Sequence, residues 1–143
     1  MLDFIRIACA VPDVAVANVE HNAQEICKYI AEADEKGVDV LVFPELCLTG
    51  ASCQDLFFED ALHHAVRKGM KQIVDCSAEH PELTIVVGLP VRAGMRMFNC
   101  AAILKEGTIA NLAIKDSLTA DERRWFDPAR EDEGHYISCQ YFG

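Results

Sequence analysis

The chain has 143 residues, of which 51% are hydrophobic and 25% are charged, a balance typical of one globular domain with a buried core. Its net charge of -10 and its pI near 4.8 argue against nucleic acid or an anionic membrane as a partner, because both require clustered Lys and Arg. The N-terminus carries Asp3 and only a short apolar run, so it resembles neither a secretion signal nor a membrane span. We therefore predict a cytoplasmic protein.

Cysteine and histidine residues are scattered without the spacing of a metal site. No CxxC pair and no HExxH motif occurs, so we predict buried, reduced thiols and no bound metal. The cysteines are Cys9, Cys27, Cys47, Cys53, Cys76, Cys100 and Cys139, and the histidines are His21, His63, His64, His80 and His135. No GxGxxG or Walker-type loop occurs either, which indicates that the chain binds no nucleotide cofactor of its own.

The first part of the chain predicts a β-α-β unit. Residues 5–10 form a short β-branched run that suits a buried strand. Apolar residues then recur at helical spacing from Val19, with Asn18 as a candidate N-cap and Gly37 as the stop. Residues 38–43 are a continuous apolar strand.

The rest of the chain predicts one more helix followed by strands. In chain order, we expect a helix from Ala61 to Val74 that ends near His80, a strand over 83–87 closed by Gly88–Pro90, a hairpin of strands 97–104 and 108–114, a charged loop over 116–134 and a last strand over 135–142. Strands that alternate with helices and then form a hairpin indicate an α/β fold with a mixed sheet and its helices on one face. Residues 1–143 are expected to be one unit, which looks unfinished because it ends directly after a strand.

Two charged residues follow buried strands and are candidate site residues. Glu45 comes directly after the strand 38–43, and ligand sites in α/β sheets gather at such strand ends. Its alternative interpretation is a solvated loop carboxylate. Lys115 follows the strand 108–114, where it either pairs with a carboxylate or marks the exit of the strand into solvent.

Five segments in order resemble the nitrilase superfamily of carbon-nitrogen hydrolases. They are VDVLVFPELCLTG, CQDLF, IVVGLPVRAGMRMFNCAAILKEG, TIANLAIK and ERRWF. The resemblance runs from about Ile5 to Phe126, and the Leu-Thr-Gly, Cys-Gln-Asp-Leu-Phe and Glu-Arg-Arg-Trp-Phe elements are most similar to the glutamine-hydrolysing domain of the NAD synthetase branch.

The resemblance implies a four-layer αββα sandwich with a Glu-Lys-Cys site. Glu45 is then the general base, Lys115 stabilises the oxyanion, and a cysteine thiolate attacks the amide carbonyl. The implied substrate is glutamine, and the implied assembly is a homo-oligomer, by default a dimer. ATP and magnesium are implied only for a separate synthetase domain downstream.

The resemblance also implies that the chain is truncated before the nucleophile strand. Cys139 is the only cysteine after Lys115, and its Ser-Cys-Gln setting does not match a Cys-Glu-Asp signature, so we interpret it as a strand residue. The chain departs from the branch at Ala51, where an aromatic residue is usual, at Ile114, where proline is usual, and in a shortened loop 116–121.

The role of Glu122 and the function of the parent protein each remain open. Glu122 corresponds either to a second glutamate near the site or to part of a solvated cluster with Arg123 and Arg124. The parent protein is either a glutamine-dependent NAD synthetase or another amidase or carbamoylase of the superfamily. A third interpretation is a binding or assembly module without a nucleophile.

Overall fold

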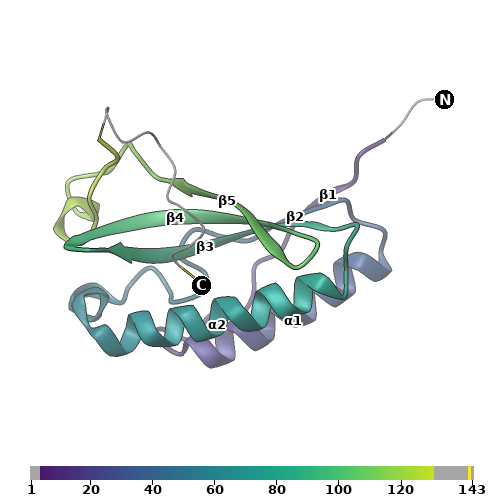
Figure 1. Ribbon diagram of the computed structural model, residues 1–143, viewed down its shortest axis with the longest axis horizontal. Coiled ribbons are helices and arrows are strands. Elements are labelled where there is room, and N and C mark those ends of the chain that lie inside the picture. Colours follow the sequence, from purple (N-terminus) through teal and green to yellow (C-terminus); the bar gives the residue numbers. More distant parts are fainter. Residues whose placement is uncertain (1–3, 131–141, 143) are drawn as a thin grey trace.

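The computed structural model describes residues 4–130 and 142, and these form an α/β structure built on one mixed sheet (Figure 1). The strands are β1 (Ile7–Cys9), β2 (Val40–Val42), β3 (Thr84–Ala93), β4 (Arg96–Lys105) and β5 (Thr108–Ile114). They lie in the order of the chain, with β1, β2 and β3 parallel and with β3, β4 and β5 antiparallel. The predicted mixed sheet is confirmed.

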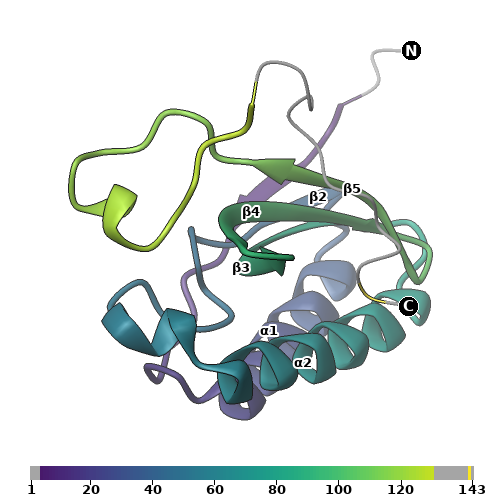
Figure 2. The same cartoon turned by 60° about the vertical axis from the view of Figure 1, so that its left-hand side comes forward.

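Two long helices cover one face of this sheet. Helix α1 (Val19–Glu35) connects β1 to β2, and α2 (Asp60–Ala78) precedes β3. Figures 1 and 2 show both helices on the same side of the strands, as the sequence predicts. Two short 3-10 helices, η1 (Gln54–Phe58) and η2 (Glu122–Arg124), lie in segments that the sequence presents as loops. No helix of the described residues is long and apolar enough to cross a membrane.

The ends of α1 follow from its sequence. The Asn18 side chain accepts a hydrogen bond from the backbone N–H of His21 at 3.2 Å, which satisfies a donor that the first turn leaves unpaired. Gly37 adopts φ +64° directly after the helix, a conformation that glycine reaches without a steric penalty. Both predicted end signals of α1 are therefore confirmed.

The core lies between the sheet and the two helices. The side chains of Leu41, Ile85 and Leu104 point toward the helices and are fully buried, whereas those of Val42 and Val86 lie on the other face and are half-buried. This alternation is the period of two that a strand imposes. The described residues thus form one α layer on one β layer, which is half of the four-layer αββα sandwich that the resemblance implies.

The sequence predicts that β3 ends at Gly88–Pro90, but this prediction is wrong, because the strand continues to Ala93. Pro90 pairs with Asn99 of β4, and the Asn99 carbonyl points toward β5, where it accepts the backbone N–H of Lys115 at 2.8 Å. The nitrogen of Pro90 therefore faces away from β4, on the side where β2 has already ended at Val42. A proline is tolerated there because no ladder hydrogen bond is lost. The predicted strand 135–142 lies almost entirely outside the described residues.

Gly88 allows the chain after β2 to lie directly against β3. A Cβ atom placed on Gly88 would lie 2.5 Å from both the Pro44 carbonyl oxygen and the Leu46 nitrogen. The Leu48 N–H also donates to the Gly88 carbonyl at 3.1 Å. The absence of a side chain at Gly88 therefore determines where residues 44–46 can lie.

Replacing Gly88 with alanine is expected to lower the free energy of unfolding by about 3 kcal/mol, because backbone atoms cannot rotate away from the new methyl group. Urea denaturation monitored by circular dichroism measures this. Gly94→Ala is the matched control, since a Cβ at Gly94 meets nothing within 4 Å and only its φ of +62° is strained, at a cost of about 1 kcal/mol. Equal losses in the two variants would contradict the close-approach explanation.

Candidate active site

Glu45 lies in a tight turn at the carboxyl end of β2. The next residue, Leu46, has a positive φ of +53°, which turns the chain sharply after Glu45. Beyond the turn, the buried Asn22 side chain of α1 donates to the Leu48 carbonyl at 3.1 Å. The turn is therefore held by the sheet through Gly88 and by α1 through Asn22, and the Glu45 side chain remains 49% exposed.

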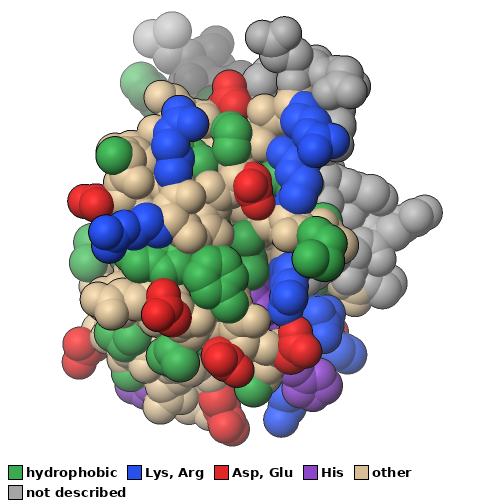
Figure 3. All heavy atoms as spheres, turned by 90° about the vertical axis from the view of Figure 1, so that its left-hand side faces the viewer, with side chains coloured by type: hydrophobic (Ala, Val, Ile, Leu, Met, Phe, Trp, Pro, Cys, Tyr) green, Lys and Arg blue, Asp and Glu red, His purple; other side chains and the backbone are tan. Residues whose placement is uncertain are grey.

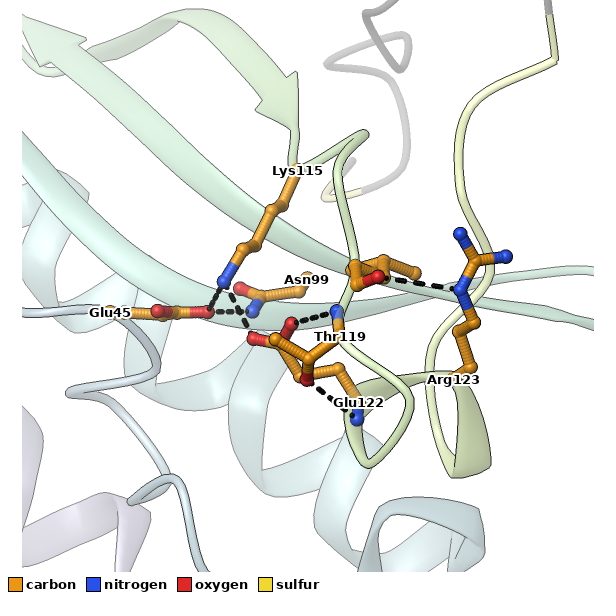
Figure 4. A network of polar contacts seen from close by, with 7 residues as sticks. Glu45, Asn99, Lys115, Thr119, Glu122 and Arg123 are labelled. Carbon is orange, nitrogen blue, oxygen red and sulfur yellow. Dashed lines mark hydrogen bonds and ion pairs between the residues drawn. The ribbon is translucent and has the colours of Figure 1, made fainter.

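Glu45 and Lys115, which the sequence singles out separately, meet at this strand end (Figure 4). Lys115 Nζ donates to Glu45 Oε1 at 2.9 Å, although 70 positions separate the two residues in the chain. Lys115 Nζ also donates to Glu122 Oε1 at 2.6 Å. The ammonium group therefore lies between two carboxylates, and Glu122 belongs to the cluster rather than to a solvated surface group.

Asn99 is a member of the cluster that the sequence reasoning missed. Its side chain is 2% exposed, and its Nδ2 donates to Glu45 Oε1. Its carbonyl accepts the backbone N–H of Lys115, so one residue of β4 orients both charged groups. The sequence signal was an amide in the otherwise apolar run Met97–Leu104, where a buried polar side chain requires a partner.

Glu122 is held in place by a capping box with Thr119. The Thr119 backbone N–H donates to Glu122 Oε2 at 2.8 Å, and the Glu122 N–H donates to Thr119 Oγ1 at 3.3 Å. This reciprocal pair is the structure that a Thr-x-x-Glu sequence encodes. The two oxygens of Glu122 thus have separate roles, since Oε2 closes the turn and Oε1 binds Lys115.

The segment after Glu122 is packed onto the rest of the molecule. The ring of Phe126 lies 4.9 Å from that of Phe57 in η1, and the Phe126 side chain is buried. The backbone N–H of Asp127 donates to the Met97 carbonyl at 2.7 Å, and the Met97 N–H donates to the Asp127 carboxylate at 3.0 Å. These contacts hold the shortened loop 116–121 against the end of the sheet.

The ion pairs shift the pKa values of two members of the cluster. The hydrogen bond from Lys115, together with that from the Thr119 backbone, lowers the pKa of Glu122 to about 2. The hydrogen bonds to Glu122 and Glu45 raise the pKa of Lys115 above its usual value. Near neutral pH, Glu122 is therefore a carboxylate and Lys115 an ammonium group.

The cluster borders a hollow of about 340 Å³ whose walls include Glu45, Asn99 and Lys115. Cys100 lines this hollow and Cys47 follows Glu45 by two residues, but burial raises the pKa of Cys47 to about 11 and that of Cys100 to about 12. Both remain thiols at neutral pH, and neither is poised as a nucleophile. Cys139 lies outside the described residues. No group of three or more candidate metal ligands occurs in the described part of the chain.

Fold and site together define a class of protein. A family model of carbon-nitrogen hydrolases matches residues 6–141, and the chain belongs to this family.

Comparisons with individual proteins agree with this assignment. A glutamine-dependent NAD(+) synthetase of Mycobacterium leprae is 31% identical over 135 residues, which cover 92% of this chain and 20% of the synthetase. A crystal structure of the same kind of enzyme from Cytophaga hutchinsonii matches with a TM-score of 0.79 and 29% identity, over 90% of this chain and 22% of that one. The chain thus spans about a fifth of the length of these relatives.

An amidase from Nesterenkonia sp. shares the fold, with a TM-score of 0.74 and 22% identity over 89% of this chain and 49% of the amidase. In another structure of that amidase, acrylamide has added to the active-site cysteine.

The pKa of Glu122 predicts a specific loss of stability in acid. Because its pKa in the folded state, about 2, lies below the ordinary 4.5, the unfolded chain takes up the proton first as the pH falls. The contribution of Glu122 is therefore complete above pH 4.5 and is lost between pH 4.5 and 2. With solvent screening, we expect it to be on the order of 1 kcal/mol.

Urea denaturation of Glu122→Gln at pH 7 and at pH 3 measures this contribution. The variant should be less stable than the wild type at pH 7 and should lose less stability between the two pH values. Asp121→Asn, which removes an exposed carboxylate one residue earlier, is the matched control and should follow the wild type. A wild-type pH dependence in Glu122→Gln would contradict the assignment.

Proposed function

We propose that Glu45 and Lys115 are the general base and the oxyanion-stabilising group of a Glu-Lys-Cys site that hydrolyses an amide. The observation that carries this proposal is the 2.9 Å contact between Lys115 Nζ and Glu45 Oε1 at the edge of a hollow. Family membership supports it, because carbon-nitrogen hydrolysis requires a base, a nucleophile and a donor to the developing oxyanion.

The hydrogen bonds of Glu45 assign different roles to its two oxygens. Asn99 and Lys115 both donate to Oε1. Among the contacts of the described residues, Oε2 accepts no hydrogen bond and is therefore the oxygen that can take a proton. A carboxylate fixed through one oxygen and free at the other is oriented for general base catalysis.

Lys115 retains one N–H for the reaction. An ammonium group has three donors, of which one is directed to Glu45 and one to Glu122. The third can donate to the oxyanion that forms when the amide carbonyl is attacked. Glu122 holds the lysine in position and raises its pKa, which keeps the ammonium charged throughout the reaction.

The nucleophile in this proposal is a cysteine supplied by sequence beyond the described residues. Cys47 and Cys100 are excluded by their raised pKa values, and the setting of Cys139 does not match a nucleophile. In the reaction, Glu45 takes the thiol proton, the sulfur bonds to the carbonyl carbon, and the C–N bond then breaks as the nitrogen takes that proton and leaves as ammonia. Water then hydrolyses the thioester.

We propose glutamine as the substrate and the supply of ammonia to NAD synthesis as the role. The support is the similarity to glutamine-dependent NAD(+) synthetases over 92% of the chain. The departure at Ile114 concerns the wall of the hollow rather than the charged cluster, because Ile114 lines the hollow beside Lys115 and its apolar side chain forms no hydrogen bond with the two carboxylates. Another amidase of the superfamily would retain the same cluster and accept a different amide.

The test is ammonia release from glutamine by a protein that continues through the native coding sequence beyond Gly143. We expect Glu45→Gln and Lys115→Met each to lower kcat/KM about 1,000-fold or more, because each removes a group that acts in the transition state. The 143-residue chain alone should release no ammonia. Full activity in both variants would overturn the proposal.

A charge-matched control separates catalysis from net charge. Lys105→Met removes a lysine at the far end of β4, where Lys105 Nζ donates to the Glu82 carbonyl, and it should leave kcat/KM unchanged. Circular dichroism should show the same fold in all three variants. If other amides are hydrolysed while glutamine is not, the mechanism holds and the proposed substrate is wrong.

We also propose that the chain self-associates through apolar surface at one end of the molecule. Phe58 and Met95 are 50% and 96% exposed and line one shallow hollow with Arg92 and Trp125. Figure 3 shows this end, with hydrophobic side chains between arginine and lysine side chains on either side. Exposed apolar side chains surrounded by charged ones are the composition that contact surfaces between proteins commonly have.

Size-exclusion chromatography with light scattering tests this association. We expect a dimer or larger species in the wild type and a shift toward monomer in a Phe58→Ser, Met95→Ser double variant, because these changes remove apolar area from the contact. Val11→Ser, at an exposed position outside this patch, is the control. A wild-type monomer at all concentrations would contradict the proposal.

A further inference from the structure

Helices α1 and α2 run parallel and approach each other closely. A Cβ atom on Gly69 of α2 would lie 2.6 Å from Val19 Cγ1 of α1, so the lack of a side chain at Gly69 allows this approach. Two turns further along each helix, the facing residues are Cys27 and Cys76, since positions seven or eight apart share a helix face. Beyond them, His80 Nδ1 lies 2.9 Å from Asp34 Oδ2.

Cys27 and Cys76 bring two thiols together between the helices. The Cys76 thiol donates to the backbone carbonyl oxygen of Cys27 at 3.9 Å across the contact between the helices. Both residues are half-buried, whereas Cys47, Cys53 and Cys100 are buried. The pair is therefore within reach of a small reagent from solvent.

The surroundings of the pair favour one thiol as the reactive partner. The hydrogen bond from Cys27 and the charge of His80 lower the pKa of Cys76 to about 7. The same hydrogen bond and burial raise the pKa of Cys27. Cys76 is thus the thiol of the pair that loses its proton more readily, and Cys27 is the second thiol.

We propose that Cys27 and Cys76 form a dithiol modification site that low-molecular-weight disulfides of the glutathione type oxidise to an intramolecular disulfide. The proposal rests on the placement of two half-buried sulfur atoms between closely packed helices. It is independent of the proposed amide hydrolysis, because neither cysteine borders the hollow at Glu45.

The reaction is two successive thiol–disulfide exchanges. The Cys76 thiolate attacks one sulfur of the reagent, a protein–reagent S–S bond forms, and the other half of the reagent leaves as a thiolate. Cys27 then loses its proton to solvent and attacks Cys76 Sγ, which expels the second half. The protein loses two hydrogens, and the reagent is reduced to two thiols.

The disulfide would close a loop that contains β2 and Glu45. Because such a bridge restricts the unfolded chain, the oxidised protein should resist unfolding more than the reduced one. We expect its Tm to rise on the order of 10 °C and to return to the original value after treatment with dithiothreitol. The modification would thus stabilise the helix layer and the segment that carries the candidate base.

The test treats the reduced 143-residue chain with oxidised glutathione and follows the intact mass, the peptide map and the Tm. The expected result is the loss of two hydrogen masses, a peptide pair that joins Cys27 to Cys76, and the rise in Tm. Cys27→Ser should stop at a stable glutathione adduct on Cys76, because a serine hydroxyl cannot attack the mixed disulfide and release glutathione. Cys76→Ser should lose the bridge and the rise in Tm.

Cys9→Ser is the matched control, since Cys9 is exposed on β1 and its removal should leave the bridge and the Tm shift unchanged. A glutathione adduct on Cys76 that persists in the wild type would overturn the proposal. So would a disulfide that involves any other cysteine, Cys139 included, in place of the Cys27–Cys76 bridge.

Discussion

The candidate site depends on one steric constraint, the contact between the turn after β2 and the bare backbone of Gly88. Because a Cβ at Gly88 would lie 2.5 Å from atoms of the turn, only glycine lets this segment lie on β3. The turn then places Glu45 beside Asn99 of β4, and the pairing of β4 with β5 places Lys115 opposite. The contact between the backbone of Gly88 and the turn therefore determines where the Glu45 carboxylate lies relative to Lys115.

Hydrogen bonds within the cluster occupy most of its donors and acceptors. The ammonium group of Lys115 donates to both Glu45 and Glu122. The Asn99 amide also donates to Glu45 Oε1. The backbone N–H of Thr119 donates to the second oxygen of Glu122. Among the described residues, both oxygens of Glu122 are therefore occupied, whereas Glu45 Oε2 and one N–H of Lys115 remain available for a substrate. Such preorganisation is what electrostatic catalysis requires, because the groups need not move when charge develops.

The sequence predicted the helices and strands and singled out Glu45 and Lys115, but it did not show that the two residues are in contact. Helical spacing, the Asn18 cap and the position of Glu45 after an apolar strand are local signals, and the structure contains each of them. The extension of β3 through Pro90 was missed, because it depends on where β2 ends, which the local sequence does not show. Asn99 was missed for the same reason, since its partner is 54 positions away. Glu122 stayed ambiguous because its Thr-x-x-Glu capping box was not recognised.

The distances along the chain that separate the cluster members have a consequence for folding. Contacts across 54 and 70 positions carry a large loop-closure entropy, which is recovered only after β2, β3, β4 and β5 have paired. A partly folded chain with only the first β-α-β unit would leave Glu45 in solvent without Asn99 or Lys115. The charged cluster therefore forms after these strands have paired, and its presence reports that β2 to β5 have assembled in register.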